Sequence, residues 1–506
     1  MSIKRFLADK DNTITNAFQQ NLSTRGTGSN MGESDILEVF SIYGQASSGS
    51  QELSRVLIHF PVATEVAAAR TAATIPASGS VNFYLRLYNA KHTNTVPSEY
   101  TLEVSAISSS WDEGHGLDME DYKHLEPSNW VSASSTSVWA RTGGDYYTGA
   151  ADPVVSQSYY GGTEDLFMDV TPLVEAMLQD SGTSGHLPDY GFGVKLASSF
   201  EAHSSNSAGT DENFIIHNTG GSSRSYYTKR FFSRGTEFFF KRPHLEARWE
   251  SKLKDDRGNF YASSSLATGA DNLNTLYLYN YVRGSLKNIP GISDGSGKIF
   301  VKLYTSASGG EILTPVGSGA FTVIDNAVTG GYKQAGIYTA SFALDTTAST
   351  VYDRWFSGST VYHTSSFGVT KLEAYNNNPT PQYYSNIENL KSTYQPDENP
   401  KLRVYVRDKN WSPTLYTVAN EEIETSTIDD AYFKIVRVID DNEIIAYGTG
   451  SDKQTKLSYD VSGNYFDLDM SLFEPGYAYS IKLLYNVNGA YHEQPDGFKF
   501  RVETEQ

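Results

Sequence analysis

The fold of the N-terminal half of this chain follows from Leu53–Pro61, which has the sequence Leu-Ser-Arg-Val-Leu-Ile-His-Phe-Pro. Val56, Ile58 and Phe60 alternate with the residues between them, and this period of two directs one set of side chains into a core and the other to the opposite sheet face. Pro61 lacks the backbone N–H that would continue the ladder, so the strand ends there. The segment predicts a buried strand.

Other segments predict a β-domain built onto this strand. Asp35–Gly44 predicts its partner strand, and the Gly- and Ser-rich residues Gly44–Gln51 predict the hairpin loop between them. More strands are predicted at Val81–Tyr88, Leu102–Ile107, Leu166–Pro172, Tyr190–Leu196, Tyr226–Ser233 and Pro243–Trp249. Their spacing places all of these strands in one domain that ends near Trp249.

Two short helical segments are predicted among these strands. The Ala-rich run Val66–Ala73 can form a helical turn but lacks the apolar stripe of a longer helix. A helix is predicted after Thr171, because Thr171 suits the N-cap, Pro172 suits the first helical position, and Leu173–Leu178 supplies an apolar stripe. Gly182 is predicted to end this helix.

Composition limits the classes of protein to which the chain can belong. The 506 residues carry a net charge of −19, from 59 acidic and 40 basic residues, which disfavours a nucleic-acid surface. Cysteine is absent, so neither disulfides nor thiolate metal sites are expected. No apolar run is long enough to span a membrane, and the N-terminus lacks the apolar segment of a signal peptide. We therefore expect synthesis in a cytoplasm.

The residues after Trp249 predict two smaller β-domains. Strands are predicted at Asn274–Tyr281, Lys298–Tyr304, Gly336–Leu344, Ser359–Val369, Leu402–Arg407, Tyr432–Val438, Ile444–Gly448, Phe466–Met470, Tyr477–Tyr485 and Phe498–Val502. The charged segment Glu250–Gly258 is a poor candidate for burial, and Asn376–Pro400, with four prolines, is a predicted linker. The predicted domains are residues 1–250, 251–395 and 396–506.

The order of motifs in the first domain resembles that of DNRLRE domains, which are related to a family of carbohydrate-binding modules. The matching pieces are Ala8-Asp9, Gly26–Gly32, Ser54–Phe60, Trp111-Asp112-Glu113, Asp169-Val170-Thr171, Tyr190-Gly191-Phe192-Gly193 and Arg242-Pro243-His244-Leu245. The resemblance implies a jelly-roll-like sandwich, and this chain departs from the family pattern by long insertions around Trp130–Tyr160 and Ala202–Tyr226. The predicted fold is all-β, a jelly-roll-like sandwich followed by two immunoglobulin-like sandwiches.

The whole chain resembles virion structural proteins of marine tailed bacteriophages. This resemblance implies a non-enzymatic component at the neck, tail or capsid surface that serves as an attachment module or spacer. Its implied location is the virion, its implied partners are other virion proteins and further copies in a symmetric homo-oligomer, and no cofactor is expected. The alternative is a carbohydrate-binding protein that docks host surface polysaccharide.

The sequence contains one dense group of possible metal ligands and none of the catalytic motifs for a nucleophile elbow, a zinc protease or a phosphate loop. The group consists of Asp112, Glu113, His115, Asp118, Glu120, Asp121 and His124. Such oxygen ligands could hold Ca²⁺ in a loop, but the glycine-hinged order of an EF-hand is missing, and a solvated acidic loop is the commoner structure. We therefore expect neither a metal site nor catalytic residues.

Adjacent tyrosines and one basic segment are the candidate binding residues. In a strand, one member of a pair must face away from the core, and exposed Tyr suits sugar-binding and protein-binding surfaces. The basic-aromatic segment Lys229–Arg242 predicts either a salt-bridged strand pair or a patch that docks an acidic subunit. The predicted binding residues are Tyr146, Tyr147, Tyr159, Tyr160, Lys229, Arg230 and Arg234.

Overall fold

The computed structural model describes residues 2–45, 50–92, 98–205, 215–293, 295–316, 321–371, 381–411, 415 and 425–504. The chain divides into two compact units. The first consists of Met1–Glu250 with Gly450–Gln454, and the second consists of Ser251–Thr449 with Thr455–Gln506. Across the described ranges, every helix is too short or too polar to cross a membrane.

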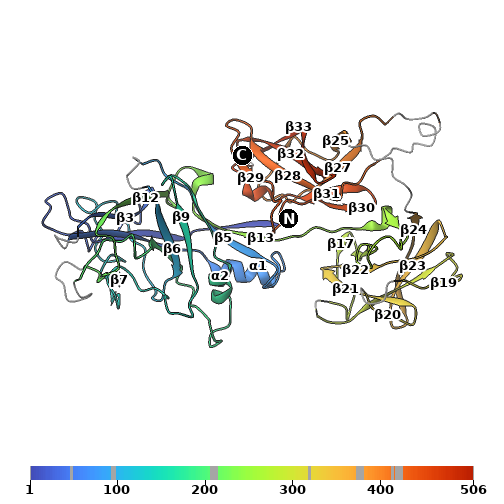
Figure 1. Cartoon of the computed structure of the whole chain (residues 1–506), viewed down its shortest axis with the longest axis horizontal. Helices are drawn as coiled ribbons and strands as arrows, with labels where there is room; N and C mark the ends of the chain where they lie inside the picture. Colours follow the sequence, from blue (N-terminus) through green and yellow to red (C-terminus); the bar gives the residue numbers. More distant parts are fainter. Residues whose placement is uncertain are drawn as a thin grey trace. The chain divides into compact units, whose positions relative to one another are not determined.

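Two antiparallel sheets form the first unit (Figure 1). In the described residues, the larger sheet runs in the order β12 (Arg224–Phe232), β3 (Ile36–Gln45), β4 (Ser50–His59), β11 (Phe192–Leu196), β6 (Tyr100–Ala106) and β9 (Val154–Tyr159), with β2 (Lys10–Thr15) paired to β4. The smaller sheet runs in the order β1 (Ile3–Leu7), β13 (His244–Arg248), β5 (Asn82–Leu87) and β10 (Leu166–Asp169). A short hairpin of β7 (Ser132–Ser134) and β8 (Ser137–Val138) lies in the loops.

Strand β4 is buried on both faces, which explains its central place. Val56 and Ile58 belong to the main apolar core, whereas Leu53 and Leu57 belong to a second apolar cluster built around Trp130. The predicted hairpin is confirmed, because β3 pairs with β4 in antiparallel register. The long insertions that the sequence predicted thus supply a second cover for the sheet.

Gly191 precedes β11 in the sequence Tyr190-Gly191-Phe192-Gly193 and lies where only glycine fits. Its φ is 86°, in the left-handed region, and a Cβ there would lie 2.3 Å from the carbonyl oxygen of Ile58. Gly193 lies equally close to a side chain, because a Cβ on it would lie 2.0 Å from Cε1 of Tyr146. The missing side chain of Gly191 lets the backbone of β4 come close, and that of Gly193 leaves room for the Tyr146 ring.

The helical predictions are confirmed in position and corrected in detail. A π-helical turn η1 (Val62–Val66) leads into α1 (Ala67–Thr71), and α2 is Thr171–Met177. The N-cap of α2 is Val170 and not Thr171, since the Thr171 hydroxyl already accepts the Phe83 N–H at 2.8 Å. The helix ends at Met177, before the predicted Gly182, and the ion pair of Arg70 with Glu175 joins α1 to α2 at 2.6 Å.

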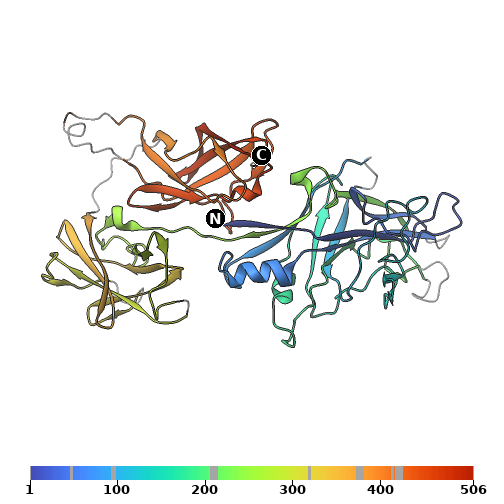
Figure 2. The same cartoon turned by 180° about the vertical axis from the view of Figure 1, so that it is seen from behind.

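The first sandwich of the second unit is one large sheet folded around its own core (Figure 2). In the described residues its order is β14 (Phe260–Tyr261), β24 (Thr360–Thr370), β23 (Thr350–Ser357), β18 (Ile299–Tyr304), β21 (Ala327–Gln334), β22 (Ile337–Phe342) and β15 (Asn274–Tyr279), with β19 (Ile312–Leu313) on β18 and β20 (Val323–Ile324) on β21. A small hairpin joins β16 (Tyr281–Val282) to β17 (Ser285–Leu286). Trp355 and Tyr338 are fully buried in this core.

In the part of the chain that the structure describes, the C-terminal sandwich has two sheets. One contains β25 (Tyr383–Ile387), β27 (Lys401–Asp408), β31 (Gly463–Asp467) and β30 (Ser458–Asp460), and the other contains β26 (Thr393–Tyr394), β33 (Ala490–Val502), β32 (Ala478–Val487), β28 (Ala431–Arg437) and β29 (Glu443–Ile445). Short 3₁₀ turns are η2 (Phe239–Lys241) in the first unit and η3 (Asp256–Gly258) and η4 (Met470–Leu472) in the second. The chain is all-β, with a jelly-roll-like sandwich followed by two immunoglobulin-like sandwiches, as predicted.

The predicted linker Asn376–Pro400 is wrong over most of its described part. It contains β25 and β26, whose residues Ile387 and Tyr394 are buried in the C-terminal sandwich. The prolines within the described part lie outside these strands, so they do not interrupt the ladders. Residues 376–380 of this region lie outside the described residues. The C-terminal sandwich therefore has strands ahead of its predicted start at residue 396.

Candidate functional site

Two of the predicted binding residues, Lys229 and Tyr159, are buried. The Lys229 ammonium donates to Asn89 Oδ1 at 2.7 Å and to the carbonyl oxygen of Glu164 at 2.5 Å, and it lies 5.0 Å from the centroid of the Tyr159 ring. Burial lowers the pKa of Lys229 to about 8, against the charges of Glu164 and Asp165. Both residues therefore support the interior of the first unit.

The two predicted arginines are engaged in ion pairs. The Arg230 guanidinium pairs with Glu38 on the neighbouring strand β3. Arg234 donates to Glu113 through Nε at 2.8 Å, and its backbone N–H donates to Asp11 at 2.6 Å. The Arg230–Glu38 pair joins two strands, as one of the two interpretations of this segment predicts, whereas Arg234 follows β12 and pairs with a loop residue.

The remaining predicted tyrosines do not form one surface. Tyr146 is half-buried and donates to the carbonyl oxygen of Gly143 at 2.9 Å, and Tyr147 packs against the main core. Tyr160 is 74% exposed, next to the buried Tyr159 at the end of β9. Tyr159, the last residue of β9, and Tyr160, which follows it, face opposite ways as the period of two predicts, whereas Tyr146 and Tyr147 lie in a loop that has no such period.

The acidic loop that could have held Ca²⁺ is organised by internal hydrogen bonds. Among the described residues, no group of three or more His, Asp or Glu side chains is arranged to hold a metal ion. The Asp118 carboxylate accepts the backbone N–H groups of Glu120 and Tyr122 at 2.8 and 2.9 Å, which closes a turn. Glu113 is held by Arg234, so these acids stabilise the loop.

One titratable cluster in the first unit was not predicted. His59, at the end of β4, lies 2.5 Å from Asp9 and 3.4 Å from Asp189. Burial opposes its protonation, but the hydrogen bonds and charges of Asp189 and Asp9 raise the pKa of His59 to about 9. Asp189 also accepts the Ala63 N–H at 2.7 Å, so the cluster ties the end of β4 to two loops.

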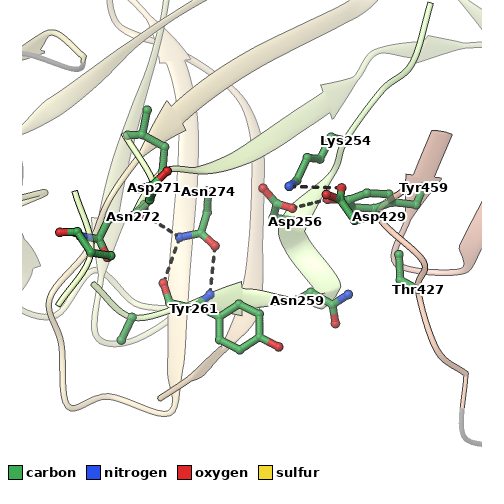
Figure 3. Close-up of a pocket in the computed structure, with 13 residues that line it drawn as sticks. Lys254, Asp256, Asn259, Tyr261, Asp271, Asn272, Asn274, Thr427, Asp429 and Tyr459 are labelled. Carbon is green, nitrogen blue, oxygen red and sulfur yellow. Dashed lines mark hydrogen bonds and ion pairs between the residues drawn. The ribbon is translucent and has the colours of Figure 1, made fainter. Parts of the chain in front are cut away.

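The candidate binding site is a pocket in the second unit, with a volume of about 360 Å³ (Figure 3). It is lined by Lys254, Asp256, Asn259, Tyr261, Ala262, Ala267, Asp271, Asn272, Leu273, Asn274, Thr427, Asp429 and Tyr459. This volume lies at the low end of the range of about 300–1,000 Å³ that is usual for small-molecule sites. Ten of the thirteen lining residues carry polar or charged groups, and Tyr261 is the exposed aromatic residue among them.

One wall of the pocket is held by asparagine side chains. Asn274 accepts the Tyr261 N–H at 3.0 Å and donates to the Tyr261 carbonyl oxygen at 2.9 Å, so it extends the edge of β14 as a strand would. Asn272 binds both backbone groups of Ser264 in the same way, at 2.8 and 2.9 Å. Figure 3 shows the Tyr261 ring pointing away from the Asn274 amide. The backbone is thus fixed while the ring stays 46% exposed.

The opposite wall is formed by charged groups. The buried Asp256 carboxylate accepts the Tyr459 hydroxyl at 2.8 Å and the Thr275 N–H at 2.7 Å, and burial raises its pKa. Lys254 pairs with the exposed Asp429 at 3.3 Å (Figure 3). Partial desolvation by neighbouring groups opposes ionisation of Asp429, but the charges of Lys254 and Lys252 lower its pKa, so the pair is ionised.

This wall corrects the prediction that Glu250–Gly258 avoids burial. Leu253, Asp255 and Asp256 are 3–6% exposed. The two aspartates can be buried because each accepts hydrogen bonds from neighbouring groups, including the Arg257 N–H on Asp255 at 3.2 Å. Burial raises the pKa of Asp255 to about 6, partly offset by Arg257.

No pattern in the sequence predicts this pocket. Its residues come from two regions of the chain, 254–274 and 427–459, which no local motif connects. The only local signals were the charged segment itself and the asparagines before β15. Chemically, the pocket offers an aromatic face together with amide, hydroxyl, carboxylate and ammonium groups.

Comparison with known proteins gives structural neighbours only. No family model matches the chain, and no curated protein matches it. A chimeric titin Z1Z2 tandem is 11% identical, covers 49% of this chain and 93% of its own, and has a TM-score of 0.15. A marsupial T cell receptor is 9% identical, covers 49% of this chain and 71% of its own, and has a TM-score of 0.16. The Ig1-2 module of the Drosophila receptor protein tyrosine phosphatase DLAR is 7% identical, covers 46% of this chain and 91% of its own, and has a TM-score of 0.14. Scores of this size do not establish a shared arrangement.

Proposed function

We propose that this protein is a non-enzymatic structural component of a tailed-phage virion, located at the neck, tail or capsid surface. It acts there as an attachment module or spacer, next to other virion proteins and in a symmetric homo-oligomer. The observation that carries the proposal is that each unit has its own buried core of β-sheet residues. Domains of this kind keep their shape without a cofactor, as a spacer requires.

Buried ion pairs between distant segments add to this support. Arg55 pairs with Glu201 in the first unit at 2.9 Å, and Arg257 pairs with Asp353 in the second at 2.7 Å. All four side chains are at most 13% exposed. Because these pairs fix long loops to strands, they favour a stiff scaffold.

Purified virions provide the test. We expect mass spectrometry of washed particles to detect this chain at a copy number that is a multiple of the symmetry of its attachment site. Negative-stain imaging of particles that carry a tagged copy should then place the label at the neck, tail or capsid surface. Particles of normal morphology that contain no copy of the chain would exclude the proposal.

The second candidate is binding of host surface polysaccharide by the first unit. The observation that favours it is the 74% exposed ring of Tyr160. Tyr146 and Tyr159 are poorly placed for direct contact, since one is half-buried and the other is 1% exposed. A glycan array should therefore show binding that Tyr160→Ala removes. Binding that survives Tyr160→Ala would exclude this surface as the site.

A further inference from the structure

We propose that the pocket of the second unit is a binding site for a neutral carbohydrate, with Tyr261 as the ring on which a sugar stacks. This inference goes beyond the structural role, which makes no use of the pocket, and it concerns a different unit from Tyr160. It rests on the positioned ring, on polar groups with unused hydrogen-bonding capacity, and on the charge of the walls.

The position of Tyr261 is the first argument. An aromatic side chain that is 46% exposed contributes little to the core, yet the Asn274 amide holds both backbone groups of this residue. The backbone that carries the ring is therefore fixed before a ligand arrives, which removes part of the entropy cost of binding. A flat ring with a polar tip suits the apolar C–H face of a sugar beside its hydroxyl groups.

Several polar groups beside the ring have capacity for a ligand. Within the described residues, the side chains of Asn259 and Thr427 and the Tyr261 hydroxyl form no hydrogen bonds. The Asp271 carboxylate accepts one side-chain hydrogen bond, from the Thr268 hydroxyl at 2.9 Å. A carboxylate accepts strong hydrogen bonds from ligand hydroxyls, and an amide both donates and accepts. Sugar hydroxyls match such a mixed set.

The charges of the pocket select between classes of sugar. Lys254 and Asp429 neutralise each other, and both oxygens of Asp256 are engaged by Tyr459 and Thr275. Because the hydrogen-bond donors of Asp256 are neutral, both Asp256 and Asp271 lack an ion-pair partner among the described residues, and the lining has an excess of carboxylates. A uronate or a sulfated sugar would face repulsion there, whereas a neutral sugar would not. The geometry points to a neutral glycan.

The test uses the whole chain on an array of neutral, amino-containing and uronate oligosaccharides. The best neutral oligosaccharide from the array then serves as the probe for titration calorimetry. We expect Tyr261→Ala to weaken its binding about tenfold or more and Asn259→Ala to weaken it less, whereas Tyr261→Phe keeps most of the affinity. Because the Tyr261 side chain is exposed and its backbone is held by Asn274, the variants should melt at the wild-type temperature.

Tyr160→Ala is the matched control, since it removes an exposed tyrosine from the other unit. It should leave binding to the probe unchanged. The inference is overturned if no neutral oligosaccharide binds, if only uronates bind, if Tyr261→Ala binds like the wild type, or if Tyr160→Ala alone abolishes binding. The virion proposal stands or falls separately, because its test is the presence of the chain in particles.

Discussion

Replacing Glu201 by Gln should strongly destabilise the first unit. The Arg55 guanidinium donates to Glu201 through Nε at 3.1 Å and through Nη2 at 2.9 and 3.0 Å, while its Nη1 donates to the carbonyl oxygen of Gly143 at 3.0 Å. It also lies 5.5 Å from the ring centroid of Trp130. The two charged side chains are only 8% and 5% exposed. Glu201→Gln keeps the shape but leaves the Arg55 charge without a counter-ion.

The size of the effect follows from this burial. Removing one partner of a buried pair costs about 3–5 kcal/mol, because the remaining charge stays out of water. With an m-value of about 3 kcal/mol per M of urea, this loss lowers the unfolding midpoint by about 1–1.7 M. The pair of Arg230 with Glu38 is the matched control, since its side chains are 41% and 33% exposed. There Glu38→Gln should cost about 0–1 kcal/mol, or less than about 0.3 M.

Pulsed hydrogen exchange with mass spectrometry, applied to the whole chain across a urea series, reports the two units separately. Peptides from β4 and β11 should lose protection at lower urea in Glu201→Gln, whereas peptides from β18 and β23 should not change. If the midpoint for β4 and β11 shifts no more in Glu201→Gln than in Glu38→Gln, the ion pair does not hold the loop to the sheet, and the reasoning fails.

Three further outcomes are expected. Protonated His59 stabilises the folded protein, because its pKa is about 9 when folded and 6.5 when unfolded; the contribution is complete below pH 6.5 and is lost as the pH rises through about 9. The free energy of unfolding of the wild type minus that of His59→Gln should therefore shrink by roughly 1–3 kcal/mol across this range. A difference that stays constant with pH would contradict this prediction. Gly191→Ala should lower the free energy of unfolding, measured in urea, by about 2–4 kcal/mol, because the added Cβ meets backbone atoms. Gly182→Ala should lower it by about 1–2 kcal/mol, because Gly182 has a φ of 96° but open space around it. Equal losses would refute the steric explanation. Met1–Glu250 and Leu253–Gln506, expressed separately, should each unfold cooperatively by calorimetry, and a fragment without a transition would show that the division is wrong.

Much of the sheet structure could be predicted from the sequence, because strands that are buried on alternate residues leave a local pattern. β4, β15, β18 and β22 all lie within a residue or a few of their predicted positions. The prediction was wrong at the segment from 381 to 400, where proline and asparagine suggested a linker. The prolines there flank the strands, so the proline and asparagine content of residues 376–400 gave no indication of the short strands β25 and β26 between them.

The binding residues were harder to predict, since exposure depends on contacts that no local pattern contains. Lysine is usually exposed, so the sequence predicts Lys229 on the surface. The residue is fully buried because three oxygens accept hydrogen bonds from its ammonium group. The alternation of strand residues was informative only for Tyr159 and Tyr160, which adjoin a strand. Tyr146 is fixed by Gly193, whose missing side chain leaves room for its ring.

The charged segment Glu250–Gly258 was predicted to be exposed, but part of it is buried. Six charges within Glu250–Gly258 predict solvent exposure if each side chain is considered alone. Tyr459 and Thr275 supply hydrogen bonds to Asp256, and with these partners burial of the carboxylate becomes tolerable. The same contacts hold Asp256 in the pocket wall opposite Tyr261. The acids that marked the segment as a boundary thus build the site, and a variant such as Tyr459→Phe, which leaves Asp256 short of one hydrogen bond, should lower the stability of the second unit while leaving Tyr261 in place.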